Sequence, residues 1–178
     1  MIRIGILVAL ALAVAGCAGM MPAGSSGATA TAEVRNATGQ VVGTATFTEV
    51  RSIVRVVLEV RGLPPGEKGV HLHEVGKCEG PPFTSAGAHV NHDQKQHGML
   101  NPAGPHAGDL PNIRIEHDGT GRLETSNNRI TLGAGPGSLF DQDGTALVIH
   151  AAPDDHRTDP TGNSGNRIAC GVVVKTSP

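Results

Sequence analysis

Residues 53–61 carry the strongest pattern in the chain, an alternation of apolar and polar side chains. Val54 and Val56 fall on one side of an extended segment, while Arg55 and Glu59 fall on the other. A period of two residues is that of a half-buried β-strand. Similar short segments recur between turns rich in Gly and Pro, and none has the periodicity of an amphipathic helix. The sequence therefore indicates an all-β fold.

We expect eight strands in this fold. They cover residues 32–36, 41–49, 53–61, 69–74, 112–117, 121–125, 145–150 and 168–175. Short strands at regular spacing, joined by Gly and Pro turns, favour an antiparallel sandwich or barrel. Trp and Tyr are absent and the chain has 3 Phe, so the core must be built mostly from Val, Ile, Leu and Ala.

The first residues have the character of an export signal. Residues 4–15 are apolar or Gly, a run that is too short to span a bilayer, which takes about 20 residues, but suits a signal peptide. Residues 14–17, Val-Ala-Gly-Cys, resemble a bacterial lipobox, in which the cysteine is lipidated after cleavage. We therefore expect residues 1–16 to be removed and Cys17 to carry a lipid anchor. A plain signal peptide with a chance Cys17 is the alternative.

The remaining chain reads as a tether followed by one domain. Residues 17–29 are rich in Gly, Ser, Ala and Pro, a composition typical of a flexible linker. Residues 30–178 are long enough to bury a core of their own. The formal net charge of −2 gives no reason to expect a nucleic-acid partner. We expect an exported protein held to a membrane, on its periplasmic or outer-surface side.

Histidines gather in one part of the sequence. His71 and His73 stand two residues apart in an expected strand, so both side chains share one face. The long loop that follows, residues 75–111, and a second long loop, residues 151–166, are of the length that usually carries function. Three further histidines and a carboxylate stand in the first loop, and one histidine ends an apolar strand before the second: His89, His97, His106, Asp109 and His150. Imidazole suits copper and zinc, and a carboxylate can complete a tetrahedral zinc shell.

These motifs resemble those of the copper/zinc superoxide dismutases, in their bacterial exported form. The matching segments are GVHLHE (69–74), SAGAHVN (85–91), HG (97–98), GPHAGDL (104–110), LVIH (147–150), DD (154–155) and GNSGNRIACG (162–171). The resemblance covers essentially residues 30–175 and implies an eight-stranded antiparallel Greek-key β-barrel with two long functional loops. It also implies one copper and one zinc ion per chain, and either a monomer or a homodimer.

The resemblance assigns roles residue by residue. It implies that copper is held by His71, His73, His89 and His150, and zinc by His89, His97, His106 and Asp109, so that His89 bridges the two ions. Asp154 stands where the family places a carboxylate that hydrogen-bonds one copper and one zinc histidine. Cys78 and Cys170 match the family's disulfide, for which two buried thiols are the alternative.

The implied activity is the disproportionation of superoxide to dioxygen and hydrogen peroxide, as a defence outside the cytoplasm. Copper alternates between Cu(II) and Cu(I) in this reaction, His89 carries a proton, and Arg167 docks the anion beside copper. The residues that steer superoxide toward the site are less defined, with Lys77, Lys95 and Arg157 as candidates.

Two other functions remain open at this point. A domain that keeps the barrel but loses a copper ligand would be a metal-binding or structural protein, although all four copper positions and Arg167 are present here. A zinc hydrolase would need an open zinc position for water, whereas the zinc set here is closed. His92, His117 and His156 match no ligand position, and we expect them to be ordinary solvated or hydrogen-bonded histidines.

Overall fold

The computed structural model describes residues 27–176. Its strands are β1 (Thr29–Asn36), β2 (Val41–Val50), β3 (Ile53–Val60), β4 (Gly66–Lys68), β5 (Val70–His73), β6 (Ile113–Ile115), β7 (Gly121–Asn127), β8 (Ala146–His150), β9 (Arg167–Val172) and β10 (Val174–Lys175). The one helix in this range is a 3-10 helix of three residues, η1 (Thr84–Ala86), so the all-β prediction is confirmed. No helix among these residues is long and apolar enough to cross a membrane. The expected signal peptide, Cys17 and most of the expected tether lie outside the described residues.

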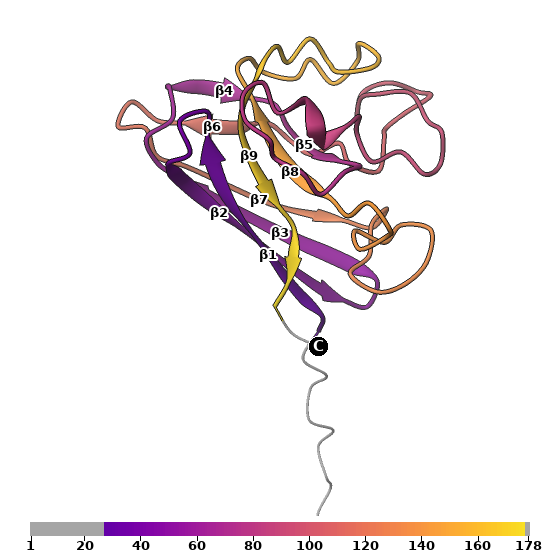
Figure 1. Cartoon of the computed structure of the whole chain (residues 1–178). Helices are drawn as coiled ribbons and strands as arrows, with labels where there is room; N and C mark the ends of the chain where they lie inside the picture. Colours follow the sequence, from indigo (N-terminus) through magenta and orange to yellow (C-terminus); the bar gives the residue numbers. More distant parts are fainter. Residues whose placement is uncertain (1–26, 177–178) are drawn as a thin grey trace, which may run out of the picture.

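The strands form a single antiparallel sheet that curls into a barrel. Nine of them follow the order β4-β6-β7-β3-β2-β1-β9-β8-β5, and β10 pairs with β1. The two edge strands of this path, β4 and β5, are consecutive in the chain and only Gly69 separates them. The edges must therefore come together, which produces a nearly closed barrel (Figure 1). The hairpin strands β1 to β3 are flanked by β9 and β7, which return from far along the chain, as in a Greek key.

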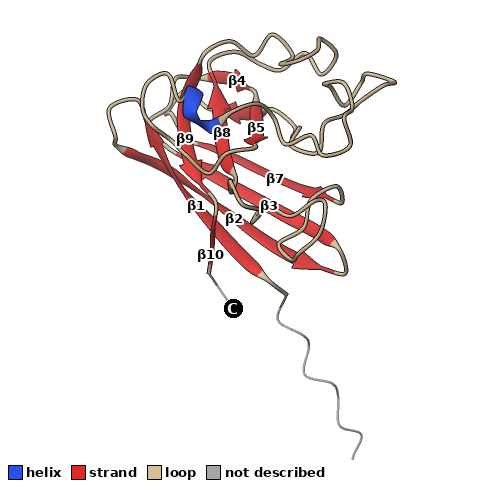
Figure 2. Cartoon of the chain, turned by 45° about the vertical axis from the view of Figure 1, so that its right-hand side comes forward, coloured by secondary structure: helices blue, strands red, loops and turns tan. Residues whose placement is uncertain are grey.

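The two long loops lie together at one end of this barrel. Figures 1 and 2 show the segment between β5 and β6 and the segment between β8 and β9 at the end remote from the described chain termini. These are the loops that the sequence predicts to be functional. The barrel therefore separates the end where the described chain begins from the end that carries the histidines.

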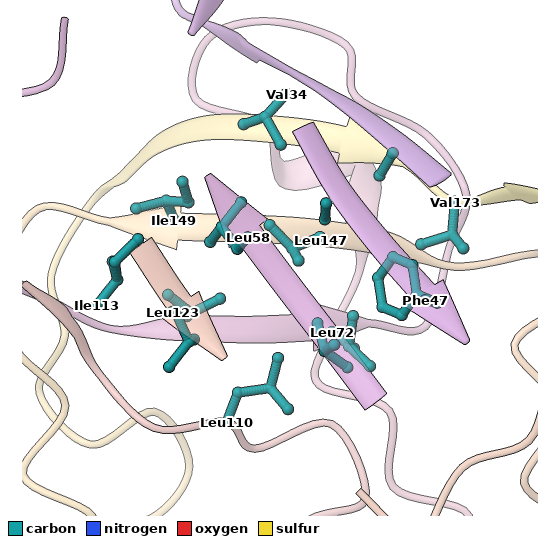
Figure 3. Packing of buried hydrophobic residues seen from close by; sticks show 14 of the residues in the cluster. Val34, Phe47, Leu58, Leu72, Leu110, Ile113, Leu123, Leu147, Ile149 and Val173 are labelled. Atoms are coloured by element: carbon teal, nitrogen blue, oxygen red, sulfur yellow. The ribbon is translucent and has the colours of Figure 1, made fainter. Parts of the chain in front are cut away.

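Aliphatic side chains fill the barrel, as the composition predicts (Figure 3). On β3 the side chains of Val54 and Val56 are fully buried while those of Arg55 and Glu59 are exposed, which agrees with the predicted alternation. Phe47 is the one aromatic residue buried in this main cluster within residues 27–176. The inner face of the sheet thus packs against an apolar core.

The strands differ from the expected ones in number and, by one to three residues, in their limits. The described part of the chain contains ten strands rather than eight, because β4 was not expected and the expected strand 168–175 divides into β9 and β10. β4 has three residues, too few for an alternation to be visible in the sequence. The division falls at Val173, whose N–H donates to the carbonyl of Thr145 at 2.9 Å. β1 begins at Thr29, one residue inside the expected tether.

A third long loop, residues 128–145, was not singled out from the sequence. It packs Ile130, Leu132 and Leu139 into the core cluster, and its Arg129 donates through Nη2 to the backbone carbonyl of Asp109 at 3.4 Å. The carboxylate of Glu49 accepts hydrogen bonds from the Thr131 hydroxyl at 2.8 Å and from the Leu132 N–H at 2.7 Å. A side chain of β2 thereby anchors this loop against the barrel.

Candidate metal centre

The free edge of β5 positions the first loop. β5 pairs with β8 on one side, and on its other side Leu72 donates to the carbonyl of Gly108 and accepts from the N–H of Val90, both at 2.9 Å. A Cβ at position 108 would lie 2.3 Å from the Leu72 carbonyl oxygen, so only glycine allows this approach. The pairing brings the residues next to Val90 and Gly108, namely His89 and Asp109, against β5.

All four side chains of β5 are buried, and they divide between two environments. Val70 and Leu72 point into the hydrophobic core, while His71 and His73 lie on the opposite face, as the two-residue spacing predicts. His150 is the last residue of β8, and its side chain is also buried. Its N–H donates to the carbonyl of Gly69 at 2.9 Å. Two adjacent strands thus hold three histidines rigidly.

Four histidines form a first cluster, in which one nitrogen from each lies within 4.8 Å of the others: His71, His73, His89 and His150. In two of these histidines Nδ1 is hydrogen-bonded to a backbone carbonyl, in His73 to that of Gly87 at 2.9 Å and in His150 to that of Gly165 at 3.0 Å. A carbonyl oxygen only accepts, so in both rings the proton sits on Nδ1 and the lone pair on Nε2. The nitrogens turned away from these bonds, His71 Nδ1 and Nε2 of His73, His89 and His150, have no hydrogen-bond partner within residues 27–176.

A second cluster surrounds one carboxylate oxygen. Asp109 Oδ1 lies 3.1 Å from His89 Nδ1, 3.0 Å from His97 Nδ1 and 3.4 Å from His106 Nδ1. His106 Nδ1 and His89 Nδ1 are 3.3 Å apart. Ligands at about 2.0–2.1 Å from a tetrahedral zinc ion are separated by roughly 3.3 Å, so these four atoms fit such a shell.

Asp109 itself is held firmly. Its other oxygen, Oδ2, accepts from the N–H of Gly98 at 2.9 Å and from that of His106 at 3.0 Å. His71 also lies near the second cluster, because the two clusters adjoin. We favour His106 over His71 as its fourth member, since His106 Nδ1 has the ligand-to-ligand distances given above and His71 Nε2 donates elsewhere, to Asp154.

Asp154 links the two clusters from behind. Its Oδ2 accepts from His71 Nε2 and its Oδ1 from His97 Nε2, both at 2.9 Å. The backbone of Asp154 is in turn held by the side-chain amide of Asn112, which accepts from its N–H at 2.8 Å and donates to its carbonyl at 2.9 Å. Sequence reasoning placed Asp154 here but missed Asn112, which offered no signal beyond starting an expected strand.

His156 lies against the same carboxylate and belongs to neither cluster. Its Nδ1 lies 3.2 Å from Asp154 Oδ2, without hydrogen-bond geometry, and its backbone N–H donates to Asp154 Oδ1 at 2.7 Å. A Cβ at Gly162 would lie 1.7 Å from the same Oδ1, and the φ of this glycine is +60°. The second loop is therefore folded closely around this single carboxylate.

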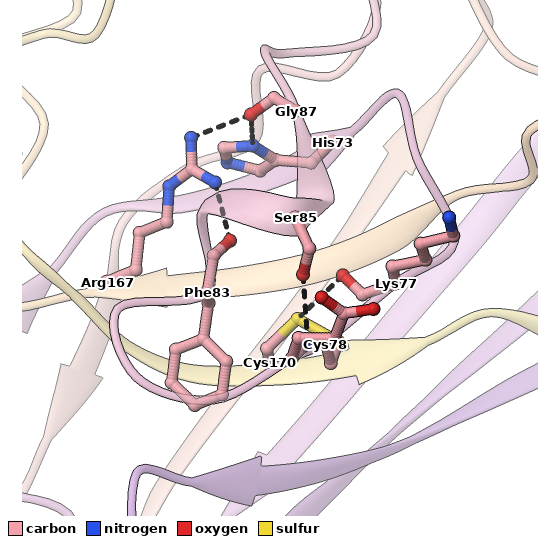
Figure 4. The surroundings of a disulfide bond; sticks show 9 residues. His73, Lys77, Cys78, Phe83, Ser85, Gly87, Arg167 and Cys170 are labelled. Atoms are coloured by element: carbon pink, nitrogen blue, oxygen red, sulfur yellow. Dashed lines mark hydrogen bonds between the residues drawn. A yellow bond between two sulfur atoms is a disulfide. The ribbon is translucent and has the colours of Figure 1, made fainter.

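Arg167 and the disulfide secure the other side of the first cluster (Figure 4). Arg167 donates through Nη1 to the carbonyl of Phe83 and through Nη2 to that of Gly87, both at 2.7 Å. The Gly87 carbonyl is the one that also accepts from His73. Cys78 and Cys170 are joined by a disulfide, which ties the loop that carries both carbonyls to β9, where Arg167 lies.

A cleft of about 590 Å³ opens over this region. Its lining includes His89 and His106 from the two clusters, together with Arg167, Lys95, Glu74 and Asp159. Among the steering candidates, Lys95 lines this cleft, whereas Lys77 and Arg157 are not part of its lining. A small anion that enters it would meet His89 beside the guanidinium group of Arg167.

The protonation of the histidines differs between the clusters. Burial lowers the pKa of His71 to about 3, that of His73 to about 2 and that of His150 to about 4, and it also lowers the pKa of His89. Burial alone would lower the pKa of His97 as well, but hydrogen bonds to Asp109 and Asp154 raise it to about 9. The first cluster therefore presents neutral imidazoles, the form that binds metals.

Both carboxylates stay ionised. Burial would raise the pKa of Asp109, but contacts with His106, His89 and His97 lower it well below its usual range. In the same way, the bonds from His71 and His97 outweigh burial and lower the pKa of Asp154. Two buried negative charges therefore face the histidines, which favours a cation between them.

We predict that the metal-free protein is most stable near pH 6.5. Below this pH, His71, His73, His89 and His150 take up protons in the unfolded chain but not in the folded one, so the free energy of unfolding falls. His97 acts on the alkaline side, because the stabilisation from its raised pKa is fully present below pH 6.5 and is lost as the pH rises toward 9. Each such group changes the free energy by up to about 1.4 kcal/mol per pH unit.

Urea unfolding of chelator-treated protein between pH 4.5 and pH 9 tests this prediction. The free energy of unfolding should fall more steeply below pH 6.5 than above it, since four histidines contribute on the acid side and His97 alone on the alkaline side. A free energy of unfolding that stays constant or rises between pH 6.5 and pH 4.5 would contradict it.

Comparison with known proteins agrees with the family that the sequence motifs resemble. The family model for copper/zinc superoxide dismutase (SODC) matches residues 41–173. The chain is 50% identical over 144 residues to superoxide dismutase [Cu-Zn] 2 of Aquifex aeolicus, covering 80% of this chain and 84% of that protein. It is 44% identical over 147 residues to superoxide dismutase [Cu-Zn] of Caulobacter vibrioides, covering 81% and 84%. Among solved structures, a superoxide dismutase-like protein from Bacillus subtilis superposes with a TM-score of 0.77 at 35% identity, covering 81% of this chain and 97% of that one.

Proposed function

Because the chain belongs to the copper/zinc superoxide dismutase family, we propose a division of roles among the residues of its two clusters in the disproportionation of superoxide. The first cluster, His71, His73, His89 and His150, would hold copper, and the second, His89, His97, His106 and Asp109, would hold zinc. The observation that carries this proposal is the convergence of four buried imidazole nitrogens without hydrogen-bond partners in the described part of the chain. Buried lone pairs that face one another are costly unless a cation lies between them.

The donor sets fit the two metals. Four imidazole nitrogens suit Cu(II), while three nitrogens and a carboxylate oxygen suit zinc in a closed structural site. Copper, when bound, supplies the one-electron couple by which one superoxide is oxidised to dioxygen and a second is reduced to hydrogen peroxide. The zinc set has no open position for a water molecule, so we do not propose a zinc hydrolase.

His89 is the residue we assign to proton transfer. Its Nδ1 faces Asp109 at 3.1 Å, and its Nε2 faces the first cluster without a hydrogen-bond partner in residues 27–176. Nε2 can therefore take up a proton and release it to the reduced oxygen species. The reaction consumes two protons for each hydrogen peroxide formed, and the second would come from water in the cleft. Asp154 fixes the rings of His71 and His97 and thus the direction of their free nitrogens.

Arg167 is the residue we assign to binding the substrate anion. Its two hydrogen bonds to loop carbonyls fix the guanidinium at the wall of the cleft, and the disulfide fixes the loop. A guanidinium group remains charged and can bind a small anion through several N–H donors. Members of this family are established examples of enzymes that attract their substrate electrostatically. A passive metal-binding domain would have no use for this cation, which favours the enzyme.

We predict that Arg167→Ala keeps both metals and the barrel but loses most of its second-order rate. Two unit charges about 5 Å apart interact by roughly 3 kcal/mol at an effective dielectric constant near 20, and about 1.4 kcal/mol corresponds to a tenfold rate change. The loss should therefore be about tenfold or more. Arg167→Glu should be slower still, and salt should slow the wild type more than Arg167→Ala.

Superoxide decay, followed by stopped flow on metal-matched samples over a salt series, measures these rates. Arg61→Ala is a suitable charge control, since Arg61 is exposed just after β3 and is not part of the lining of the cleft. A wild-type rate in Arg167→Glu would contradict the role of Arg167 in binding the anion.

The ligand division leads to a separate prediction. Asp109→Ala should lose zinc and stability but keep some copper, because this carboxylate belongs to the second cluster alone. His73→Ala should lose copper and all dismutase activity while it keeps the fold and zinc. Metal analysis of both variants decides the matter, and equal loss of both metals in each would exclude the proposed division.

We also propose that the protein is exported and anchored by a lipid on Cys17. Residues 14–17 support this through their lipobox-like sequence, and the Cys78–Cys170 disulfide is typical of proteins outside the reducing cytosol. The described chain begins at the barrel end away from the two long loops (Figure 2), so a tether from there would leave the cleft open to solvent. A monomer or a homodimer remains our prediction for the oligomeric state.

We predict that Cys17→Ser either releases soluble protein or leaves an uncleaved precursor, because the thiol that receives the lipid is absent. Membrane fractionation and the mobility of the processed chain measure this result. Cys17→Ser that fractionates with membranes and is processed like the wild type would contradict the anchor. The metal content should not change, since Cys17 lies outside both clusters.

A further inference from the structure

His106 differs from the other proposed ligands in what holds its outer nitrogen. The outer nitrogens of His71 and His97 donate to Asp154, and those of His73 and His150 donate to backbone carbonyls. His106 Nδ1 faces the second cluster, and its Nε2 faces the second loop. A ring that offers the Nδ1 lone pair to a metal carries its proton on Nε2, so this N–H needs an acceptor.

The carboxylate nearest to that nitrogen belongs to Asp159. Among the described residues, the carboxylates within ion-pair distance of His106 are Asp109, through Nδ1, and Asp159, whose Oδ1 lies 3.7 Å from Nε2. The same Oδ1 accepts a hydrogen bond of 2.5 Å from the backbone N–H of His97. One oxygen of the second loop thus lies between two proposed zinc ligands of the first loop.

The surroundings of Asp159 also join the two loops. The N–H of Leu100 donates to the carbonyl of His156 at 2.9 Å. A Cβ at Gly98 would lie 2.3 Å from that carbonyl oxygen, which shows how closely the backbones approach. Asp159 stands at the solvent side of this contact, with its side chain 47% exposed and that of His106 7% exposed. It therefore covers the outer face of the second cluster.

Asp159 has no evident use toward the substrate. It lines the same cleft as Lys95 and Arg167, where its negative charge opposes the entry of an anion. Its contribution is therefore to be sought at the histidines that it contacts.

We propose that Asp159 is a positioning residue for zinc, which accepts from the N–H of His97 and from His106 Nε2 and thereby couples zinc binding to the docking of the second loop. The inference rests on the zinc assignment made above and adds a residue to it. The distance of 3.7 Å is about 0.8 Å longer than a typical N–H···O hydrogen bond, so a small rotation of either side chain in the zinc-loaded protein completes the contact.

The test is the zinc affinity of the copper-free protein, measured by competition with a chromophoric chelator. Loss of a partner of a ligating histidine typically weakens metal binding 10- to 100-fold, and the partial exposure of Asp159 places it at the lower end. Asp159→Ala should raise the zinc dissociation constant about tenfold. Asp159→Asn keeps an acceptor oxygen without the charge and should fall between the wild type and Asp159→Ala. Asp93→Ala, which removes an exposed carboxylate of the first loop, should bind zinc like the wild type.

Thermal unfolding of each variant with and without zinc separates positioning from a purely structural role. If Asp159 positions the zinc ligands, its removal should reduce the stabilisation that zinc adds. Asp159→Ala that binds zinc like the wild type, or that lowers both midpoints equally, would overturn the inference. If the wild type itself bound no zinc, the zinc assignment would fail first, which the affinity of the unaltered protein reveals.

Discussion

The pairing of a loop with the free edge of β5 is the contact on which the site depends. An edge strand leaves backbone groups unpaired. Here the N–H of Leu72 donates to the carbonyl of Gly108, and the carbonyl of Leu72 accepts from the N–H of Val90. The same strand therefore supplies two histidines directly and fixes the positions of His89 and Asp109 through its backbone. β5 therefore takes part both in closing the barrel and in assembling the histidine clusters.

The electrostatic arrangement follows from that assembly. Two buried carboxylates contact the histidines. Asp109 lies among the rings of the second cluster, and Asp154 lies behind the rings of His71 and His97. These contacts keep both carboxylates ionised. In the metal-free protein a proton on His97 partly balances them, which its raised pKa reflects. A cation in the second cluster would replace that proton, so metal binding and proton release are linked at this side chain.

The features that could be predicted from the sequence are those that a residue pattern shows directly. The alternation on β3 gave the sheet, and the spaced histidines gave the residues that the structure brings together, because their chemistry and order are visible without coordinates. Sequence reasoning missed β4, which is too short for a pattern, and the third loop, residues 128–145, whose buried leucines have no fixed period. It also missed Asn112 and Asp159, since each acts through a neighbour that is distant in the sequence.

The first and last strands of the barrel bring the two ends of the described chain together. The N–H of Thr176 donates to the carbonyl of Thr29 at 3.0 Å, and the two hydroxyl groups lie 2.9 Å apart. The chain therefore enters and leaves the barrel at one place, and a short linker could join the two ends without disturbing a strand. Domains of this kind tolerate circular permutation and insertion into the loops of other proteins. Such a rearrangement would keep both histidine clusters at the far end of the barrel, free of the junction.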